Sequence, residues 1–100
     1  MTIERLISHK RRYENFVEPA FRAYDISNTM ILQGRGTEEE IERQRQHAFA
    51  LATQAGRELE ILRDIDADTA GKLADDWRAY GEELQVDPKL IADACGGFPE

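Results

Sequence analysis

The sequence predicts an all-α protein, a compact bundle of about four helices, two long and two short, folded as a single domain over residues 1–100. Three observations support this prediction. Apolar residues recur at spacings of three and four along most of the chain, as they do on one face of a helix. No stretch alternates apolar and polar residues as a half-buried strand does. The chain has the length of one domain, and its 41% apolar and 33% charged residues suit helices with one buried and one solvated face.

The first helix is expected over residues 3–32, because one apolar stripe runs through this segment in phase with a helix. Gly34 favours its end. Pro19 lies inside the segment, and proline kinks helices because it lacks a backbone N–H. Since the stripe continues across Pro19, we expect either one kinked helix or two abutting helices. The stripe consists of Ile3, Leu6, Tyr13, Val17, Ala20, Tyr24 and Ile31.

The second helix is expected over residues 38–63 and has the clearest start in the chain. Thr37 and Glu40 match a capping box, in which each side chain accepts a hydrogen bond from the backbone N–H of the other residue. An apolar stripe then extends this helix toward Arg63. The stripe consists of Ile41, Ala48, Leu51, Ala52, Ala55, Leu59 and Leu62.

Two shorter helices are expected over residues 67–85 and 88–95. Asp66 can cap the first of them with its carboxylate, and Asp87 followed by Pro88 is a typical start for the second. The predicted buried face of the third helix consists of Ala70, Leu73, Ala74, Trp77, Tyr80 and Leu84.

The cysteine content and the hydropathy indicate in which cellular compartment the protein is expected. Cys95 is the only cysteine, so the chain cannot form an intrachain disulfide, and a reducing environment is expected. The first residues lack the apolar run of a signal peptide, and no run of about 20 apolar residues occurs. We therefore expect a cytoplasmic protein with no membrane partner.

Four aspartates partly match a calcium-binding EF-hand loop. Asp64, Asp66, Asp68 and Asp75 stand at loop positions 1, 3, 5 and 12. Position 6, which needs glycine for a sharp turn, holds Thr69, and position 12 is an aspartate where a bidentate glutamate is needed. We therefore expect no metal site, and we expect Asp66 or Asp68 to cap the third helix instead.

Residue types that act in catalysis lack the neighbours that they need. His9 and His47 have no ligand partner at metal-binding spacing, and nothing near Cys95 in the sequence would activate a thiol. We expect both histidines at the surface and Cys95 as a small buried residue. The sequence predicts no catalytic residue, no cofactor and no enzyme activity; an enzyme that pairs a carboxylate with His47 is an alternative.

The net charge of −7 is unevenly distributed. Residues 1–36 contain six basic and four acidic residues, whereas residues 37–100 contain seven basic and sixteen acidic residues, a balance of −9. Residues 88–95 are similar to the recognition helix of a helix-turn-helix, but Lys89 is their only cation and Asp93 opposes it. Because the acidic part repels phosphate, we expect no direct nucleic-acid binding and a basic protein surface as the partner.

The acidic residues around the third helix form the candidate partner-binding site. Three of them recur every seven residues and therefore lie on one side of the helix, away from Leu73 and Trp77. A solvated outer face with no partner is the alternative interpretation. The predicted partner-binding residues are Asp64, Asp66, Asp68, Asp75, Asp76, Glu82 and Glu83.

In size, acidity and helical content the chain resembles the small phage-encoded anti-CRISPR proteins. Locally, the resemblance is carried by the acidic residues in segments 38–40, 64–68 and 75–76. The resemblance implies a non-catalytic inhibitor, found in the host cytoplasm, that binds a CRISPR surveillance complex or nuclease and blocks its DNA binding. The alternative is an antitoxin-like or self-associating regulatory or adaptor subunit that uses apolar seams on the first two helices. The sequence leaves the oligomeric state open.

Overall fold

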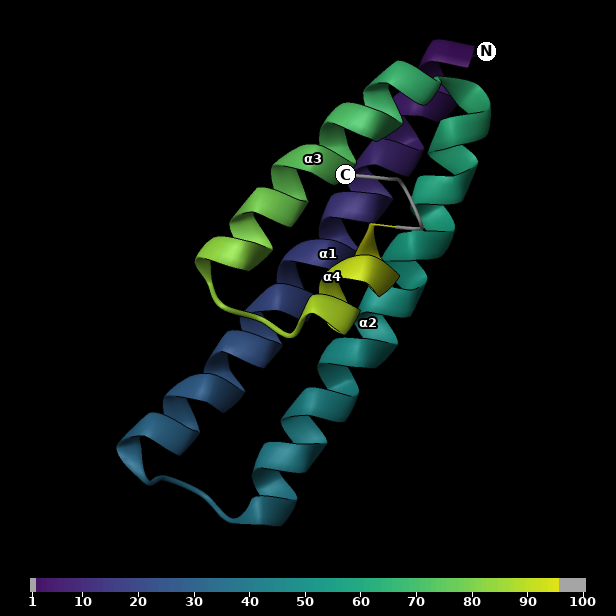
Figure 1. Ribbon diagram of the computed structural model, residues 1–100. Coiled ribbons are helices and arrows are strands. Elements are labelled where there is room, and N and C mark those ends of the chain that lie inside the picture. Colours follow the sequence, from purple (N-terminus) through teal and green to yellow (C-terminus); the bar gives the residue numbers. More distant parts are fainter. Residues whose placement is uncertain (1, 96–100) are drawn as a thin grey trace.

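The computed structural model describes residues 2–95, which form four helices and no strand (Figure 1). The helices are α1 (Thr2–Gln33), α2 (Glu38–Ile65), α3 (Ala67–Glu83) and α4 (Pro88–Ala94). The predicted all-α bundle of two long and two shorter helices is therefore confirmed. The helix ends lie within two residues of the expected ones.

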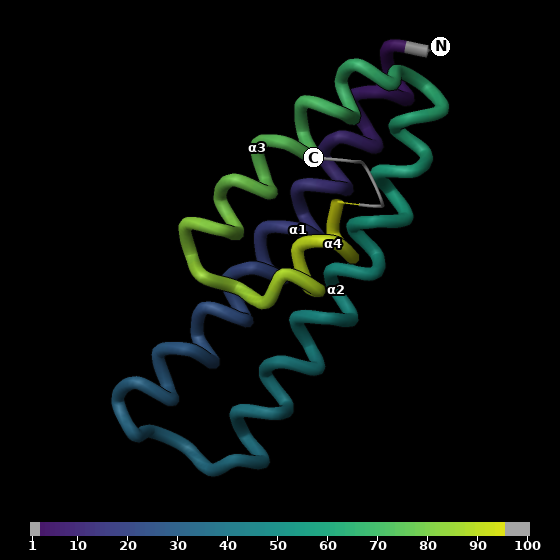
Figure 2. Tube along the Cα trace, viewed as in Figure 1, coloured from purple at the N-terminus to yellow at the C-terminus, as the bar shows by residue number. Residues whose placement is uncertain are grey.

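The two long helices form an antiparallel hairpin that sets the length of the molecule. A helix of 32 residues is about 48 Å long at a rise of 1.5 Å per residue, close to the longest dimension of 49 Å. Helices α3 and α4 lie beside one part of this hairpin, and the end that joins α1 to α2 projects beyond them (Figure 2). Helices α3 and α4 therefore cover only part of the hairpin, and its connecting end consists of α1 and α2 alone.

Helix α1 continues through Pro19 as one element. Proline leaves the carbonyl of the residue four positions earlier without its helical donor. That residue is Asn15, which is exposed, so water can reach this part of the helix. Val17 and Phe21, on either side of the proline, are fully buried. Packing on both sides of Pro19 thus keeps the backbone helical. The sequence alone allowed either one kinked helix or two abutting helices here.

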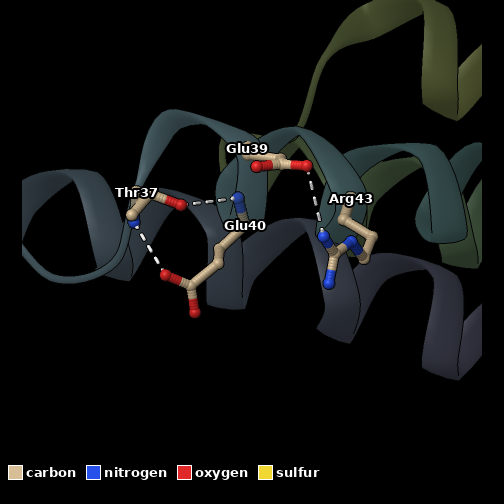
Figure 3. A network of polar contacts seen from close by, with 4 residues as sticks. All are labelled: Thr37, Glu39, Glu40 and Arg43. Carbon is tan, nitrogen blue, oxygen red and sulfur yellow. Dashed lines mark hydrogen bonds and ion pairs between the residues drawn. The ribbon is translucent and has the colours of Figure 1, made fainter.

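The connection between α1 and α2 is built from local hydrogen bonds. Gly34 has a positive φ of 63°, and the N–H groups of Gly34 and Arg35 bond back to α1 carbonyls, which is a Schellman ending. The Thr37 hydroxyl accepts from the Glu40 N–H, and the Glu40 carboxylate accepts from the Thr37 N–H, at 3.1 and 3.0 Å. Figure 3 shows this capping box beside the Glu39–Arg43 ion pair of 3.6 Å. The predicted capping box is confirmed.

Asp66 alone separates α2 from α3 and caps the start of α3, as expected. Helix α3 ends two residues earlier than expected, at Glu83, because the backbone leaves the helical path at Gln85, whose φ is 59°. The N–H groups of Gln85 and Val86 bond to the carbonyls of Glu82 and Gly81 at 3.1 Å each. This is a second Schellman ending. Its left-handed residue is Gln85 and not the glycine that usually marks such an ending in a sequence, so the sequence did not predict it.

The core lies between the long hairpin and the helices α3 and α4 that cover part of it. Its buried side chains run from Tyr13 to Ser27 on α1 and from Ala48 to Leu62 on α2. Ile3 and Ile31, which the apolar stripe placed inside, are exposed because they lie toward the ends of α1, beyond the buried stretch. Tyr80 of α3 was also expected to be buried, but its side chain is 43% exposed.

Gly81 brings three helices into close contact. A Cβ atom at this position would lie 2.9 Å from Cγ1 of Ile91 on α4 and 3.1 Å from Cε2 of Phe21 on α1. These distances are shorter than ordinary carbon contacts. The absence of a side chain at Gly81 therefore lets α3 approach α1 and α4 at this point.

Candidate protein-binding surface

The predicted acidic stripe lies on the solvent side of α3. Asp68, Asp75 and Glu82 are exposed, and they span about 21 Å along the helix. Asp75 forms an ion pair of 3.1 Å with Arg78, one turn further along. The three carboxylates thus form one exposed row on a rigid element, the geometry that their spacing predicted.

Asp64 and Asp66, at the head of the stripe, differ from each other. Asp64 is exposed in the last turn of α2. Asp66 is half-buried, and its carboxylate accepts hydrogen bonds from the N–H groups of Asp68 and Thr69 and from the Thr69 hydroxyl, at 3.1 to 3.4 Å. Asp66 is therefore already engaged in capping α3.

Asp76 and Glu83 are exposed but belong to a different side of α3. Successive helical residues are turned by about 100°, so Asp76 points well away from Asp75. Asp76 lies beside Trp77 at the edge of a groove between α3 and α1. Asp76 therefore lies outside the row formed by Asp68, Asp75 and Glu82 and belongs to the groove wall.

We call this depression the α1–α3 groove; it is open and has a volume of about 450 Å³. Phe21 packs behind the groove, with its ring centroid 6.0 Å from Trp77, and Trp77 meets Tyr80 edge to face at 5.6 Å. The lining residues are Lys10, Glu14 and Glu18 of α1 and Leu73, Asp76, Trp77 and Tyr80 of α3.

Sequence reasoning missed this groove because its two walls are about 60 residues apart in the chain. The only sequence signal was the apolar face of the third helix, which was assigned entirely to the core. In the fold, Leu73 is buried, Trp77 is half-buried and Tyr80 is 43% exposed. The buried face thus passes into an aromatic surface toward the end of α3.

Most residues of the partial EF-hand match lie in a helix and not in a loop. Residues 67–75, which would be loop positions 4 to 12, are helical, so their side chains radiate outward and do not wrap around a common centre. Within residues 2–95, no three side chains of histidine, cysteine, aspartate or glutamate gather in a way that could hold a metal ion.

The prediction that His9 lies at the surface is wrong, because its side chain is mostly buried and paired with Glu58. Its Nδ1 atom lies 2.7 Å from Oε2 of Glu58, and both side chains are mostly buried. The antiparallel pairing of α1 with α2 brings these two residues together from 49 positions apart. His47 is exposed, as predicted.

Cys95 and Tyr13 are buried polar groups on the inner side of the bundle. The Cys95 thiol donates to the Ala74 carbonyl oxygen at 3.5 Å, and burial raises its pKa to about 11. Burial also raises the pKa of Tyr13 far above its ordinary value, and its hydroxyl has no hydrogen-bond partner among the described residues. A thiol with a raised pKa is a poor nucleophile, so Cys95 serves packing.

Helix α4 packs with one face into the core. Leu90, Ile91 and Ala94 are buried, and the Lys89 ammonium lies 5.8 Å from the centre of the Phe49 ring on α2. The one cation of the former recognition-helix candidate therefore sits over an aromatic ring of the bundle.

None of the helices described between residues 2 and 95 combines the length and the apolar character that crossing a lipid bilayer requires. Comparisons with models of protein families, with curated proteins and with solved structures found no match to this chain.

Proposed function

We propose that this protein is a non-catalytic inhibitor that docks through the acidic stripe of α3 on a basic, nucleic-acid-handling protein and blocks its access to DNA. The observation that carries the proposal is the row of exposed carboxylates Asp68, Asp75 and Glu82 on one rigid helix. A surface of this kind attracts the Lys and Arg residues that otherwise hold a phosphate backbone.

The charge distribution supports the same proposal. The balance of −9 after residue 36 extends the negative potential beyond the stripe itself. At physiological ionic strength the attraction between opposite exposed charges is screened over a length of roughly 8 Å. This screening length shortens as salt rises, so binding of this kind weakens. The resemblance to anti-CRISPR proteins makes a CRISPR surveillance complex or nuclease in the host cytoplasm the first partner to test.

The test is capture of partners from a bacterial lysate by the tagged protein, at low and at moderate salt, followed by mass spectrometry. We expect a basic nucleic-acid-binding complex that is lost as salt rises. The variant Asp75→Lys/Glu82→Lys reverses two of the three charges in the stripe, and Glu42→Lys/Glu60→Lys makes the same charge change at exposed positions of α2. Equal capture by the two double variants would contradict docking through α3.

A second candidate function is self-association as a regulatory subunit, and the end of the α1–α2 hairpin favours it. Ile26, Ile31 and Leu32 are exposed there, Leu32 at 86%. Apolar side chains at a projecting two-helix end can form a seam with a second copy. Light scattering at increasing concentration tests this: we expect a dimer that the variant Ile31→Glu/Leu32→Glu abolishes, and a monomer at all concentrations would reject it.

A further inference from the structure

The α1–α3 groove offers two aromatic rings to a ligand. Trp77 is half-buried and stands edge to face with Tyr80, which is 43% exposed. Leu73 lies beneath them, and Phe21 of the core supports both rings from behind, at centroid distances of 6.0 and 6.4 Å. The rings are thus fixed from inside while part of their surface faces the solvent.

Carboxylates from both walls surround these rings. The lining holds three acidic side chains and one ammonium, Lys10, which leaves two net negative charges. Glu18 is paired with Arg22 on its own helix. The side chains of Glu14 and Asp76, on opposite walls, make no hydrogen bond or ion pair with any residue in the described part of the chain.

We propose that this groove receives an arginine side chain of the partner protein, stacked on the exposed ring of Tyr80 beside Trp77 and bonded to Glu14 and Asp76. The inference rests on the proposed function and adds an anchor point to it. Electrostatic complementarity selects a cation, and the exposed rings select a flat one, because a guanidinium stacks on aromatic faces and bonds to carboxylates through several N–H groups. A lysine ammonium is a more strongly hydrated point charge and gains less from these rings.

The single tryptophan makes the groove directly observable. Trp77 is the only tryptophan in the chain, so its fluorescence reports on this site. The full-length protein is titrated at low salt with hexa-arginine and, separately, with hexa-lysine, both blocked at their ends. We expect hexa-arginine to bind about three- to fivefold more tightly and to change the Trp77 emission more strongly. Equal affinities with unchanged emission would overturn the proposal.

Two adjacent aspartates provide a matched pair of variants. Asp76→Asn removes a charge from the groove wall, and Asp75→Asn removes the same charge from the outer stripe one residue away. We expect Asp76→Asn, and likewise Tyr80→Leu, to reduce the preference for arginine over lysine to less than twofold. Asp75→Asn should weaken both peptides to the same extent and preserve the preference. Circular dichroism confirms that each variant remains helical.

The outcomes separate this inference from the proposed function. If both peptides bind, both aspartate variants weaken them alike and arginine has no advantage, the groove is not an anchor but docking through acidic residues stands. If neither peptide binds at low salt, both proposals fail. If binding and the arginine preference depend on Asp76 and Tyr80, both are supported.

Discussion

At the scale of single residues, two glycines of α3 occupy opposite environments. A Cβ atom at Gly81 would lie within 3.1 Å of side chains on α1 and α4, whereas a Cβ at Gly71 would meet nothing within 4 Å. Glycine is unfavourable inside a helix relative to alanine, because it loses more backbone freedom on folding. The same substitution therefore has opposite consequences at the two positions.

We predict that Gly71→Ala raises the free energy of unfolding by about 0.5–1 kcal/mol. Gly81→Ala should lower it by about 1–2 kcal/mol, because Ile91 and Phe21 have to move and this strain exceeds the gain in helix propensity. Urea denaturation followed by circular dichroism measures both values. A stabilising Gly81→Ala would mean that α3 and α4 are not in close contact.

The buried thiol of Cys95 leads to a prediction about pH. Its pKa is raised to about 11 by burial, and only the thiolate reacts with disulfide reagents. We expect the native protein to react at pH 8 at least about a hundredfold more slowly than the unfolded chain, whose thiol has an ordinary pKa. The native rate should rise about tenfold per pH unit between pH 8 and pH 10, because the thiolate fraction grows in that proportion.

An aromatic disulfide reagent, followed by its absorbance with and without urea, measures these rates. A native rate that stops increasing below pH 9 would show that the thiol is accessible and titrates normally.

At the scale of elements, some helix ends are set by residues close in the sequence and could be predicted, whereas others could not. The start of α2 depends on Thr37 and Glu40 alone, and the start of α3 on Asp66, since a capping bond joins residues two or three positions apart. Both starts could therefore be predicted. The end of α3 could not, because Gln85 adopts the left-handed conformation that usually requires glycine or asparagine.

This strained position gives the next prediction. Gln85→Gly should raise the free energy of unfolding by about 1 kcal/mol, because glycine adopts a φ of 59° without the steric cost that other residues pay. The hydrogen bonds of the ending are made by backbone groups and are retained. Thermal unfolding measures the effect. A decrease in stability would show that the Gln85 side chain contributes contacts that outweigh its strain.

At the scale of the whole molecule, the bundle is unevenly covered. Residues 28–47, which include the end of α1 and the start of α2, contain no buried side chain, whereas residues 48–62 of α2 contain five. Segments with few buried contacts open locally at lower free energy than the core does. We therefore expect the hairpin end to open more readily than residues 48–62 of α2.

Hydrogen exchange followed by mass spectrometry tests this gradient within one helix. We predict that backbone amides of residues 42–47 exchange at least tenfold faster than those of residues 52–62, although both segments are helical. Uniform protection along α2 in the monomer would contradict this prediction. Protection of the hairpin end only at high protein concentration would instead point to self-association there.

The sequence by itself determined the helical class, the helix starts and the exposed row of Asp68, Asp75 and Glu82, because helical periodicity and capping depend on residues less than about seven positions apart. Only the tertiary structure decided what depends on distant parts of the chain. The pairing of α1 with α2 joins His9 to Glu58, and the approach of α3 to α1 turns Trp77 and Tyr80 from core candidates into the floor of a groove. Such contacts follow from how helices pack against each other, and no spacing within a single helix records that.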